Sequence, residues 1–325
     1  MLAAYIDRFG PPEVIRHGEL PDPVPGPTDV LVAVDAVAVN HVDTFVRSGA
    51  WRTPVPLPFV VGRDLVGTVV AAGPGAPGFA PGDRVWCNSL GHEGRQGAAA
   101  ERAVVPVDRL YHLPPGADPL DTVAVAHGAA TAHLGLFTHG RLRAGESVVV
   151  VGAAGNVGGA AVVLAARAGA RVVAVASARD EDRCRSLGAA EFVDHRAPDP
   201  GARIRAACPS GAGVWLDTAG ANDLPLAVDA LARRGRIVLL AGLRTRPALP
   251  AGALYLKEGS VHGFAISHAT VPELAEAAAA VGRLTAERAL APRATETLPL
   301  NAAAEAHRRL ENGEVRGKMI LIVRT

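Results

Sequence analysis

The sequence has few cysteines and no long uninterrupted apolar stretch. Only three of its 325 residues are cysteines, an odd number placed far apart: Cys87, Cys184 and Cys208. They provide neither a disulfide framework nor a Cys-x-x-Cys zinc pair, so we expect a protein of the reducing cytoplasm. The longest apolar stretch, at 148–170, is interrupted by five glycines and one arginine, which argues against a membrane-spanning helix of ~18 uncharged residues. The N-terminus lacks a basic segment followed by an apolar one, so we expect no signal peptide.

An excess of charge of one sign is also missing. Lys and Arg together number 33 and Asp and Glu 32, which gives a net charge of +1. A protein that binds nucleic acid through its phosphates normally carries a clear basic excess, so we expect no nucleic-acid partner. The composition, 49% hydrophobic and 20% charged, excludes a disordered or fibrous chain. The length is sufficient for two domains.

The first third of the chain is rich in proline, glycine and valine and predicts short strands. Residues 29–40 alternate larger apolar residues with small or polar ones, as a strand with one buried face does. Residues 65–73 and 83–87 predict further strands, separated by a turn rich in glycine and proline at 73–83. Short strands joined by such turns indicate an antiparallel, barrel-like domain.

Near residue 120 the pattern changes to helices and buried strands. Residues 119–140 carry apolar side chains at helical spacing, although Gly128 and Gly135 weaken the expected helix. Residues 146–177 predict a continuous apolar strand, a glycine loop, a helix and a second strand. Further strands are expected at 191–194, 213–220, 236–242, 260–266 and 318–323, and further helices at 224–235, 272–283 and 300–312. Strands alternating with helices indicate a parallel sheet covered by helices on both faces.

A glycine-rich loop separates the first buried strand from its helix and consists of Gly152, Ala153, Ala154, Gly155, Asn156, Val157 and Gly158. Glycines let backbone N–H groups approach a pyrophosphate, and the N-terminus of the following helix adds a favourable dipole. Gly155 and Gly158 fill the second and third places of the G-x-G-x-x-G pattern, whereas Ala153 occupies the first. The strand–loop–helix context predicts a dinucleotide site, with a tight turn that binds no ligand as the alternative.

The residues after the second strand bear on which dinucleotide is bound. An NAD-specific site needs Asp or Glu at this place, to bond the ribose hydroxyls. The chain instead has Ser177 and Arg179, with Arg183 one turn later. A hydroxyl and a guanidinium can bond the 2′-phosphate that a carboxylate would repel, which favours NADPH. Asp180 and Asp182 are acids that could contact a ribose, but a solvated helix N-terminus explains both better.

Six sequence blocks in the same order resemble the medium-chain dehydrogenase/reductase superfamily, and within it the zinc-independent quinone oxidoreductases of the zeta-crystallin group. The blocks are VNHVDTFVRSG (39–49), PFVVGRDLVGTVVAAG (58–73), GDRVW (82–86), TAHLGL (131–136), VVGAAGNVG (150–158) and GEVRGKMILIV (313–323). The resemblance covers essentially the whole chain.

That resemblance implies an α/β fold in which a Rossmann doubly wound parallel sheet is combined with a GroES-like β-barrel catalytic domain. It places the first part of the catalytic domain at 1–120, the NADPH-binding Rossmann domain at 121–260, and a return segment that completes the catalytic domain at 261–325. It also implies a homodimer joined through the edge of the Rossmann sheet.

The resemblance further predicts that no metal is bound. Where zinc alcohol dehydrogenases of this superfamily carry a Cys and a Gly-His-Glu, the chain has Asn40 and Gly62-Arg63-Asp64. An arginine cannot ligate zinc, and the four closely spaced cysteines of the structural zinc lobe are also missing. His92 and Glu93 are adjacent residues of a loop without a third ligand, a pattern that more often belongs to a solvated loop than to a metal site.

By resemblance, the catalytic residues are Asn40, Asp43 and Thr44. Asn40 and Asp43 would line the cleft beside the nicotinamide, with Thr44 nearby, and Asn40 could donate a hydrogen bond to a carbonyl oxygen. Local alternatives are a turn residue that bonds nearby backbone for Asn40 and a helix cap for Asp43. Three histidines are possible proton donors but are more often packing or surface residues: His41, His127 and His133.

The resemblance assigns further residues to the coenzyme site. Thr131 would lie close to the ring amide, Lys318 near the cofactor, and His195 near the adenosine phosphate. Alternatives are a surface charge at a strand start for Lys318 and a solvated loop position for His195. Gly242 and Phe264 complete the implied coenzyme-binding set.

These residues indicate hydride transfer without a Lewis acid. Without zinc, oxidation of a simple alcohol loses its usual means of stabilising an alkoxide. A quinone or an α,β-unsaturated carbonyl compound instead moves the developing charge onto an oxygen, for which one or two hydrogen-bond donors suffice. We therefore predict an NADPH-dependent reductase of quinones or enones. Alternatives are an enoyl-thioester reductase on the same scaffold and a protein that binds NADPH without turnover.

Overall fold

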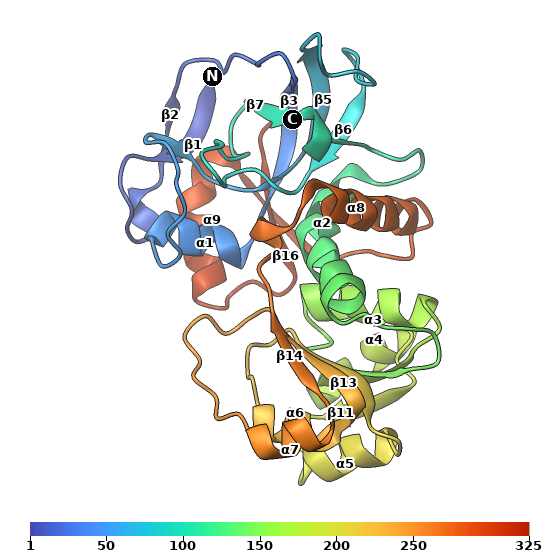
Figure 1. The fold of residues 1–325 in the computed structure, drawn as a ribbon. Coiled ribbons are helices and arrows are strands. Elements are labelled where there is room, and N and C mark those ends of the chain that lie inside the picture. Colours follow the sequence, from blue (N-terminus) through green and yellow to red (C-terminus); the bar gives the residue numbers. More distant parts are fainter. Residues whose placement is uncertain (325) are drawn as a thin grey trace. The chain divides into compact units, whose positions relative to one another are not determined.

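Residues 1–324, which the computed structural model describes, divide into two compact units (Figure 1). The terminal unit contains Met1–His127 and the chain from Leu274 onward, and the central unit contains Gly128–Glu273. This division lies later than the predicted boundaries at residues 120 and 260. Helix α2 (Pro119–His133) runs across the first boundary, so no turn-rich linker marks it. Strand β14 (Ser260–Gly263), which begins at the second predicted boundary, belongs to the central sheet.

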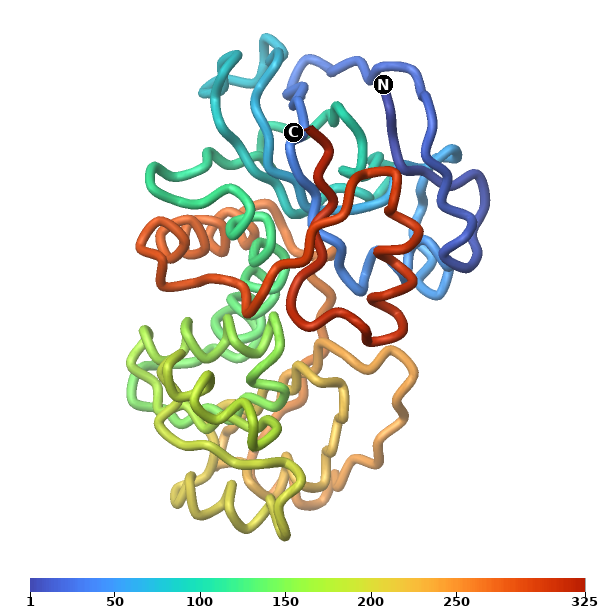
Figure 2. Tube along the Cα trace, turned by 180° about the vertical axis from the view of Figure 1, so that it is seen from behind, coloured from blue at the N-terminus to red at the C-terminus, as the bar shows by residue number. Residues whose placement is uncertain are grey.

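The terminal unit is built on two β-sheets and contains both ends of the chain, which Figure 2 shows in blue and red. The larger has the order β15-β16-β3-β5-β6-β8, with β7 paired to β3, and the smaller has the order β2-β1-β4. The larger sheet consists of β3 (Asp29–Val39), β5 (Asp64–Ala72), β6 (Arg84–Cys87), β7 (Arg102–Pro106), β8 (Tyr111–His112), β15 (Thr295–Pro299) and β16 (Lys318–Ile322). The smaller consists of β1 (Leu2–Ile6), β2 (Arg16–Glu19) and β4 (Phe59–Val60). The strands predicted at 29–40, 65–73 and 83–87 appear as β3, β5 and β6.

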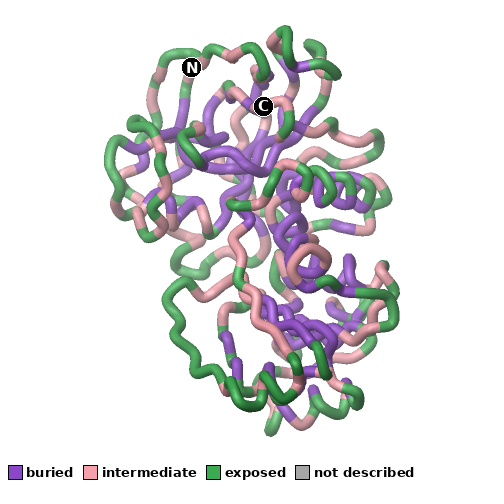
Figure 3. The backbone as a smooth tube through the Cα atoms, in the orientation of Figure 1, coloured by how far each residue is buried: buried purple, intermediate pink, exposed green. Residues whose placement is uncertain are grey.

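Strand β3 connects the two ends of the chain within the terminal unit. Most of its apolar residues are buried, and the tube of Figure 3 is coloured accordingly along this part of the unit; the buried valines are Val30, Val32, Val34, Val37 and Val39. The C-terminal strand β16 pairs antiparallel with the end of β3, with Met319 opposite Val39. This register brings Lys318, the first residue of β16, next to Asn40, which directly follows β3.

Three helices lie wholly or mostly in the terminal unit: α1 (His41–Ser48), α8 (Val271–Ala286) and α9 (Ala303–Glu311). The last two correspond to the helices predicted at 272–283 and 300–312, although a 3-10 turn precedes α9. No helix within residues 1–324 is both long and apolar enough to cross a membrane.

The central unit contains one six-stranded sheet in which all neighbouring strands are parallel. The order is β11-β10-β9-β12-β13-β14, which is the Rossmann order with β9 as the first strand. Its other strands are β9 (Ser147–Val151), β10 (Arg171–Ala176), β11 (Glu191–Asp194), β12 (Ala212–Asp217) and β13 (Leu231–Leu239). The accompanying helices are α3 (Asn156–Arg167), α4 (Glu181–Ser186), α5 (Pro200–Ala207), α6 (Leu224–Ala230) and α7 (Ala251–Leu256). The predicted doubly wound parallel sheet is confirmed.

The helix predicted at 224–235 is shorter in the structure. Helix α6 ends at Ala230, and β13 begins at Leu231, which pairs with Ala212 of β12. The prediction was wrong for 231–235, because pairing with a neighbouring strand overrides the local helical pattern. The two strands approach so closely that a Cβ on Gly211 would lie 2.5 Å from the backbone of Ala232.

The helix predicted at 119–140 is divided into α2 and a π-helical segment, Leu134–His139. Its two glycines lie where neighbouring groups come close. A Cβ on Gly128 would lie 3.5 Å from the backbone of Asn156, and one on Gly135 would lie 3.0 Å from Leu216. The loss of helix propensity at these positions is therefore offset by close packing.

Candidate functional site

Buried polar side chains surround Asn40, where β3 ends and α1 begins. Asn40 has an extended backbone, with φ −117° and ψ 156°. Its backbone N–H donates to Asp43 Oδ2 at 2.7 Å, as in a capping box, which holds that carboxylate against the start of α1. Only 6% of Asn40 and 4% of Asp43 are exposed. Asp43 therefore caps the helix, the alternative considered for it, while being buried beside Asn40.

The Asn40 side chain joins two elements that are distant in the sequence. Nδ2 donates to Asp64 Oδ2 at 2.8 Å, and Oδ1 accepts a hydrogen bond from Lys318 Nζ. Asp64 opens β5 and Lys318 opens β16, the two strands that flank the end of β3. Asn40 is therefore not a turn residue that bonds only local backbone. Lys318, only 5% exposed, is not a surface charge.

Arg63 and His127 complete this group of side chains. Arg63 immediately precedes Asp64 and is 2% exposed. His127, in α2, has its Nδ1 3.7 Å from Asp64 Oδ1. We call the six residues the polar cluster, and all of them belong to the terminal unit: Asn40, Asp43, Arg63, Asp64, His127 and Lys318.

Burial shifts the titration of the polar cluster toward neutral forms. Desolvation raises the pKa of Asp43 to about 6, although Arg63 and Lys318 act in the opposite direction. Desolvation likewise raises the pKa of Asp64 and lowers that of Lys318. Burial and the neighbouring cations lower the pKa of His127 well below its ordinary value, so its imidazole is neutral at physiological pH.

The raised pKa of Asp43 predicts that stability falls as the pH rises. Its pKa is 3.8 in the unfolded chain and about 6 in the folded protein. Between these values the folded protein binds more protons, so the free energy of unfolding decreases with increasing pH, by about 3 kcal/mol in total for this group. We expect Asp43→Asn, which cannot ionise, to lose this part of the slope. Urea unfolding of both proteins across this pH range measures it, and equal slopes would contradict a raised pKa.

Thr44, predicted as a catalytic residue, lies apart from these contacts. Its hydroxyl donates to the carbonyl oxygen of His41 at 2.8 Å within α1. No hydrogen bond in the described chain joins it to Asn40 or Asp64. Its catalytic role stays a prediction.

The polar cluster does not fit zinc. Zinc is bound by thiolate, imidazole and carboxylate groups, whereas an amide and a guanidinium stand at the two positions that matter, Asn40 and Arg63. His92 is only 4% exposed and lies 2.9 Å from Thr53 through its Nδ1, so it is not a solvated loop residue as predicted. Among residues 1–324 no group of three or more His, Cys, Asp and Glu side chains is placed to hold a metal ion.

Sequence reasoning did not bring Arg63 and Asp64 into the site. They were considered only as residues that replace zinc ligands. Their position in the sequence could have indicated a role in the site. They are two charged residues within a stretch, 59–72, that is otherwise mostly apolar. Charged groups in a segment that is buried need polar partners.

In the central unit, the predicted coenzyme residues follow the carboxyl ends of different strands. Gly152 follows β9, Ser177 follows β10, His195 follows β11, Gly242 follows β13 and Phe264 follows β14. The carboxyl ends of parallel strands lie at one edge of the sheet, and the order of strands reverses at β9. This switch point is where such sheets bind dinucleotides.

Thr131, in α2, lies near the start of α3, which follows the glycine-rich loop. It is buried, and it lies one helical turn from Gly128, which is close to Asn156 at the start of α3. Phe264 stacks on His139 with ring centroids 4.4 Å apart.

The glycine-rich loop has the geometry of an anion site. Gly152, rather than Ala153, adopts the left-handed conformation, with φ +79°, so the alanine in the first place of the pattern causes no strain. A Cβ on Gly158 would lie 2.1 Å from the carbonyl oxygen of Gly152, which requires glycine there. Gly155 precedes α3 and has no side chain that could cap this helix. A pyrophosphate fits this arrangement.

The residues after β10 form a short 3-10 turn, Ala178–Asp180. The Arg179 side chain is 71% exposed, with its Nε 3.9 Å from Asp180 Oδ2. Asp180 is only 5% exposed, so the prediction of a solvated helix N-terminus was wrong for it; the turn directs it inward before α4 begins. His195 has a half-exposed side chain and lies 3.9 Å from Asp194.

Asp217, at the end of β12, is a structural residue of this edge that the sequence analysis missed. Its buried carboxylate accepts hydrogen bonds from the backbone N–H groups of Ala219 and Gly220 at 2.9 Å and of Asn222 at 2.5 Å. Asn222 in turn donates to the carbonyl oxygen of Ala241 at 3.1 Å. The loops after β12 and β13 are thereby held together beside Gly242.

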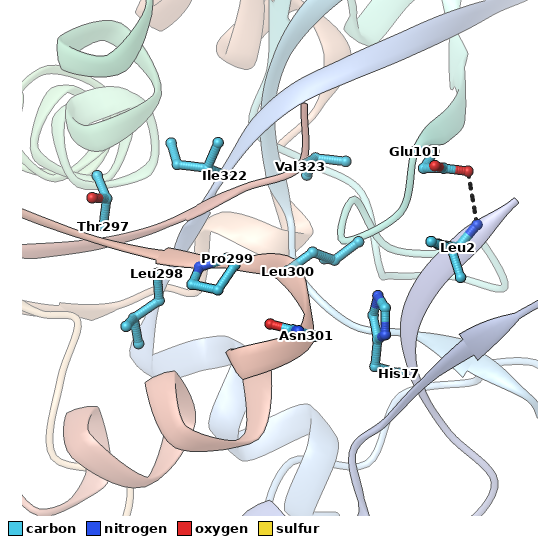
Figure 4. Close-up of a pocket in the computed structure, with 10 residues that line it drawn as sticks. All are labelled: Leu2, His17, Glu101, Thr297, Leu298, Pro299, Leu300, Asn301, Ile322 and Val323. Atoms are coloured by element: carbon cyan, nitrogen blue, oxygen red, sulfur yellow. Dashed lines mark hydrogen bonds between the residues drawn. The ribbon is translucent and has the colours of Figure 1, made fainter. Parts of the chain in front are cut away.

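A separate pocket of about 420 Å³ lies in the terminal unit (Figure 4). It is lined by parts of β1, β2 and the segment 297–301, including His17 and Asn301. Its one carboxylate, Glu101, accepts a hydrogen bond from the backbone N–H of Leu2 at 2.8 Å. No residue of the polar cluster lines this pocket, so we assign it no part in the reaction.

Two family models match the chain: "Alcohol dehydrogenase GroES-like domain" at residues 26–115 and "Zinc-binding dehydrogenase" at residues 156–280. The quinone oxidoreductase of Mus musculus is 31% identical over 335 residues, which cover 99% of this chain and 98% of the relative. A solved quinone oxidoreductase of Escherichia coli, complexed with NADPH, is 25% identical, with a TM-score of 0.86 over 99% of this chain and all of the other. A solved NAD-dependent alcohol dehydrogenase is 33% identical, with a TM-score of 0.89 over the full length of both chains.

Proposed function

Because the chain belongs to the quinone oxidoreductase group of the medium-chain dehydrogenase/reductase superfamily, whose members are oxidoreductases, we propose that it uses NADPH to reduce a quinone or an α,β-unsaturated carbonyl compound without zinc. The observation that carries this proposal is the polar cluster, in which an amide and a guanidinium stand at two positions where a zinc site needs ligands, and Lys318 adds a second buried cation. Hydrogen-bond donors of this kind suit an oxygen that gains negative charge. All three cysteines are free thiols, as is usual in the reducing cytoplasm, which we propose as the location.

The preference for NADPH over NADH rests on the residues after β10. Ser177 and Arg179 offer a hydroxyl and a guanidinium to a 2′-phosphate. A carboxylate that reached the ribose would favour NADH instead. Asp180, beside Arg179, is a carboxylate in this turn, but it is buried and turned away from solvent. The neighbours differ in the same respect, since one was solved with NADPH and another is described as NAD-dependent.

The polar cluster holds and orients a hydrogen-bond donor for the acceptor. When bound, the reduced nicotinamide supplies a hydride. Lys318 is a donor only, so its bond to Asn40 Oδ1 fixes which end of the amide faces Asp64. Nδ2 carries two hydrogens and uses one for Asp64, which leaves the other for the carbonyl oxygen of the acceptor. A solvent proton then neutralises that oxygen.

The proposal is tested by following the loss of NADPH absorbance with a panel of quinones, enones and a crotonyl thioester. We expect a higher kcat/KM for a quinone or enone than for the thioester, a higher kcat/KM with NADPH than with NADH, and no effect of a chelator. A preference for the thioester would support the enoyl-thioester reductase alternative. Coenzyme binding without consumption across the panel, or activity lost to a chelator and restored by zinc, would refute the proposal.

We also propose that two copies of the chain associate through the edge of β14. In the described chain this strand pairs only with β13, so one side of it has unused backbone hydrogen-bonding groups. The segment between these strands carries four exposed apolar side chains: Leu243, Leu249, Tyr255 and Leu256. Proteins generally cover an open strand edge and exposed apolar groups. Sedimentation equilibrium measures the mass, and a monomer at micromolar concentration contradicts this assembly.

A further inference from the structure

Arg63 is a buried cation whose side chain donates no hydrogen bond within the described residues. Only 2% of the residue is exposed, and both its Nε and Nη2 atoms are enclosed without an acceptor. A buried charged donor that lacks a partner destabilises the folded protein by far more than an exposed one. Such a group therefore requires an explanation in the function of the protein.

The other two buried arginines of residues 1–324, Arg236 and Arg47, each donate a hydrogen bond to a carboxylate. Arg236 donates to both carboxylate oxygens of Glu146, at 2.7 and 2.9 Å, and to the carbonyl oxygens of Gly140 and Arg141. Arg47 donates to Glu311 through Nη2, although its Nε and Nη1 atoms are enclosed without an acceptor, as Nε and Nη2 of Arg63 are. Arg63 has two carboxylates nearby, Asp43 and Asp64, which attract it electrostatically but accept no hydrogen bond from it.

The position of Arg63 is set by its backbone and by Trp51. The preceding residue, Gly62, has φ +90°, a conformation that favours glycine, and the carbonyl oxygen of Arg63 accepts a hydrogen bond from Leu90 N–H at 3.2 Å. The guanidinium carbon lies 5.8 Å from the centre of the Trp51 ring, which covers it on one side. The guanidinium is thus held in place while its N–H groups remain unused.

We propose that Arg63 binds the carbonyl oxygen of the acceptor and stabilises the negative charge that forms on it. This inference rests on the proposed function and adds a second donor to Asn40. In the reduction, a C–H bond of the dihydronicotinamide breaks and a C–H bond forms at the acceptor. The displaced π-electron pair moves to the acceptor's oxygen, and water later supplies the proton. A guanidinium donates two parallel hydrogen bonds, so it suits an oxyanion better than a neutral carbonyl.

The first test compares Arg63→Met with the wild-type protein and with a matched control, Arg16→Met. Arg16 has a 66% exposed side chain and an ion pair with Asp7 at 2.9 Å. We expect kcat/KM for the best acceptor to fall roughly 100-fold or more in Arg63→Met and to stay unchanged in the control. Arg63→Lys should recover part of the activity, because it restores the charge but not the paired donors.

A stability measurement separates this role from a structural one. Because the Arg63 side chain donates no hydrogen bond to the protein, we expect an apolar side chain of similar length to change thermal stability little, since protonation of Asp43 and Asp64 can offset their lost attraction to the cation. A large fall in the melting temperature of Arg63→Met would indicate a structural role. The pH profile separates a third case: if Arg63 acts only by keeping Asp43 and Asp64 ionised, raising the pH restores the activity of the variant, whereas loss of a direct contact lowers kcat/KM at every pH.

Binding of 4-nitrophenol provides a readout that does not depend on turnover. Its phenolate has its own visible absorption band and resembles the oxyanion of a reduced quinone. With oxidised coenzyme present, we expect the wild-type protein and Arg16→Met to bind the phenolate and lower its pKa, and Arg63→Met to lose this preference for the anion. An identical pKa shift in wild type and Arg63→Met would overturn the proposal. If the wild-type protein consumes no NADPH with any acceptor, the proposed function fails, yet the phenolate titration still decides whether Arg63 binds an anion.

Discussion

Replacing Gly158 with alanine is expected to lower the affinity for NADPH by at least about 100-fold, equivalent to about 2.7 kcal/mol. The new Cβ would lie 2.1 Å from the carbonyl oxygen of Gly152 and 2.8 Å from Cα of Ala153. Both atoms belong to backbone, so the loop itself must move. Its N–H groups would then leave the positions in which they can bond a pyrophosphate. Fluorescence titration of the purified variant with NADPH measures the change.

The matched control is Gly252→Ala in the same unit. A Cβ at Gly252, within α7, meets no atom within 4 Å. Alanine there favours the helix, so coenzyme affinity should stay at the wild-type level. An unchanged affinity in Gly158→Ala would show that the loop does not bind the pyrophosphate, and the coenzyme assignment would then fail.

Asn40→Leu is expected to reduce kcat/KM by roughly 100-fold and to lower the free energy of unfolding by about 2–4 kcal/mol. Leucine has nearly the shape of asparagine but neither donates nor accepts. The substitution removes the donor to Asp64 and the acceptor of Lys318, and both of these ionisable groups are buried. The amide hydrogen that we assign to the acceptor's oxygen disappears as well.

Two comparisons make this prediction specific. Asn312→Leu changes an exposed asparagine whose side chain bonds Glu314 at 3.0 Å, and it should alter neither quantity by much. NADPH binding should persist in Asn40→Leu, because the predicted coenzyme residues other than Lys318 lie in the central unit. Wild-type kcat/KM in Asn40→Leu would remove Asn40 from the reaction, whatever its effect on stability.

The coenzyme-binding half of the protein could be predicted closely from the sequence. Strand 191–194 was predicted with the bounds that β11 has. The glycine loop and the residues after β10 were predicted at strand ends, where the structure has them, whereas Gly242 was predicted inside a strand at 236–242 and instead follows β13, which ends at Leu239. This success has a local cause: a buried parallel strand, a glycine turn and a helix each leave their own pattern within a few residues of sequence.

The polar cluster was not predictable in the same way. The bond between Lys318 and Asn40 joins residues separated by 278 positions, and it exists because β16 pairs with β3. In the sequence, Arg63 and Asp64 were interpreted only as residues that replace zinc ligands. In the structure, the start of β5 places them beside Lys318 and Asn40. The end of α6 was predicted wrongly for the same reason. Leu231 pairs with a neighbouring strand, and a pattern within a few residues of sequence cannot show such pairing.

The amino-acid sequence by itself determined the parallel sheet and the turn chemistry at Gly152 and Gly158, because these depend on backbone conformation and on the order of neighbouring residues. Only the tertiary structure decided which charges share a buried environment, and hence that burial raises the pKa of Asp43 to about 6 and that the Arg63 side chain donates no hydrogen bond. Desolvation and hydrogen bonding depend on the atoms around a group. Those atoms come from strands that the chain brings together only when it folds.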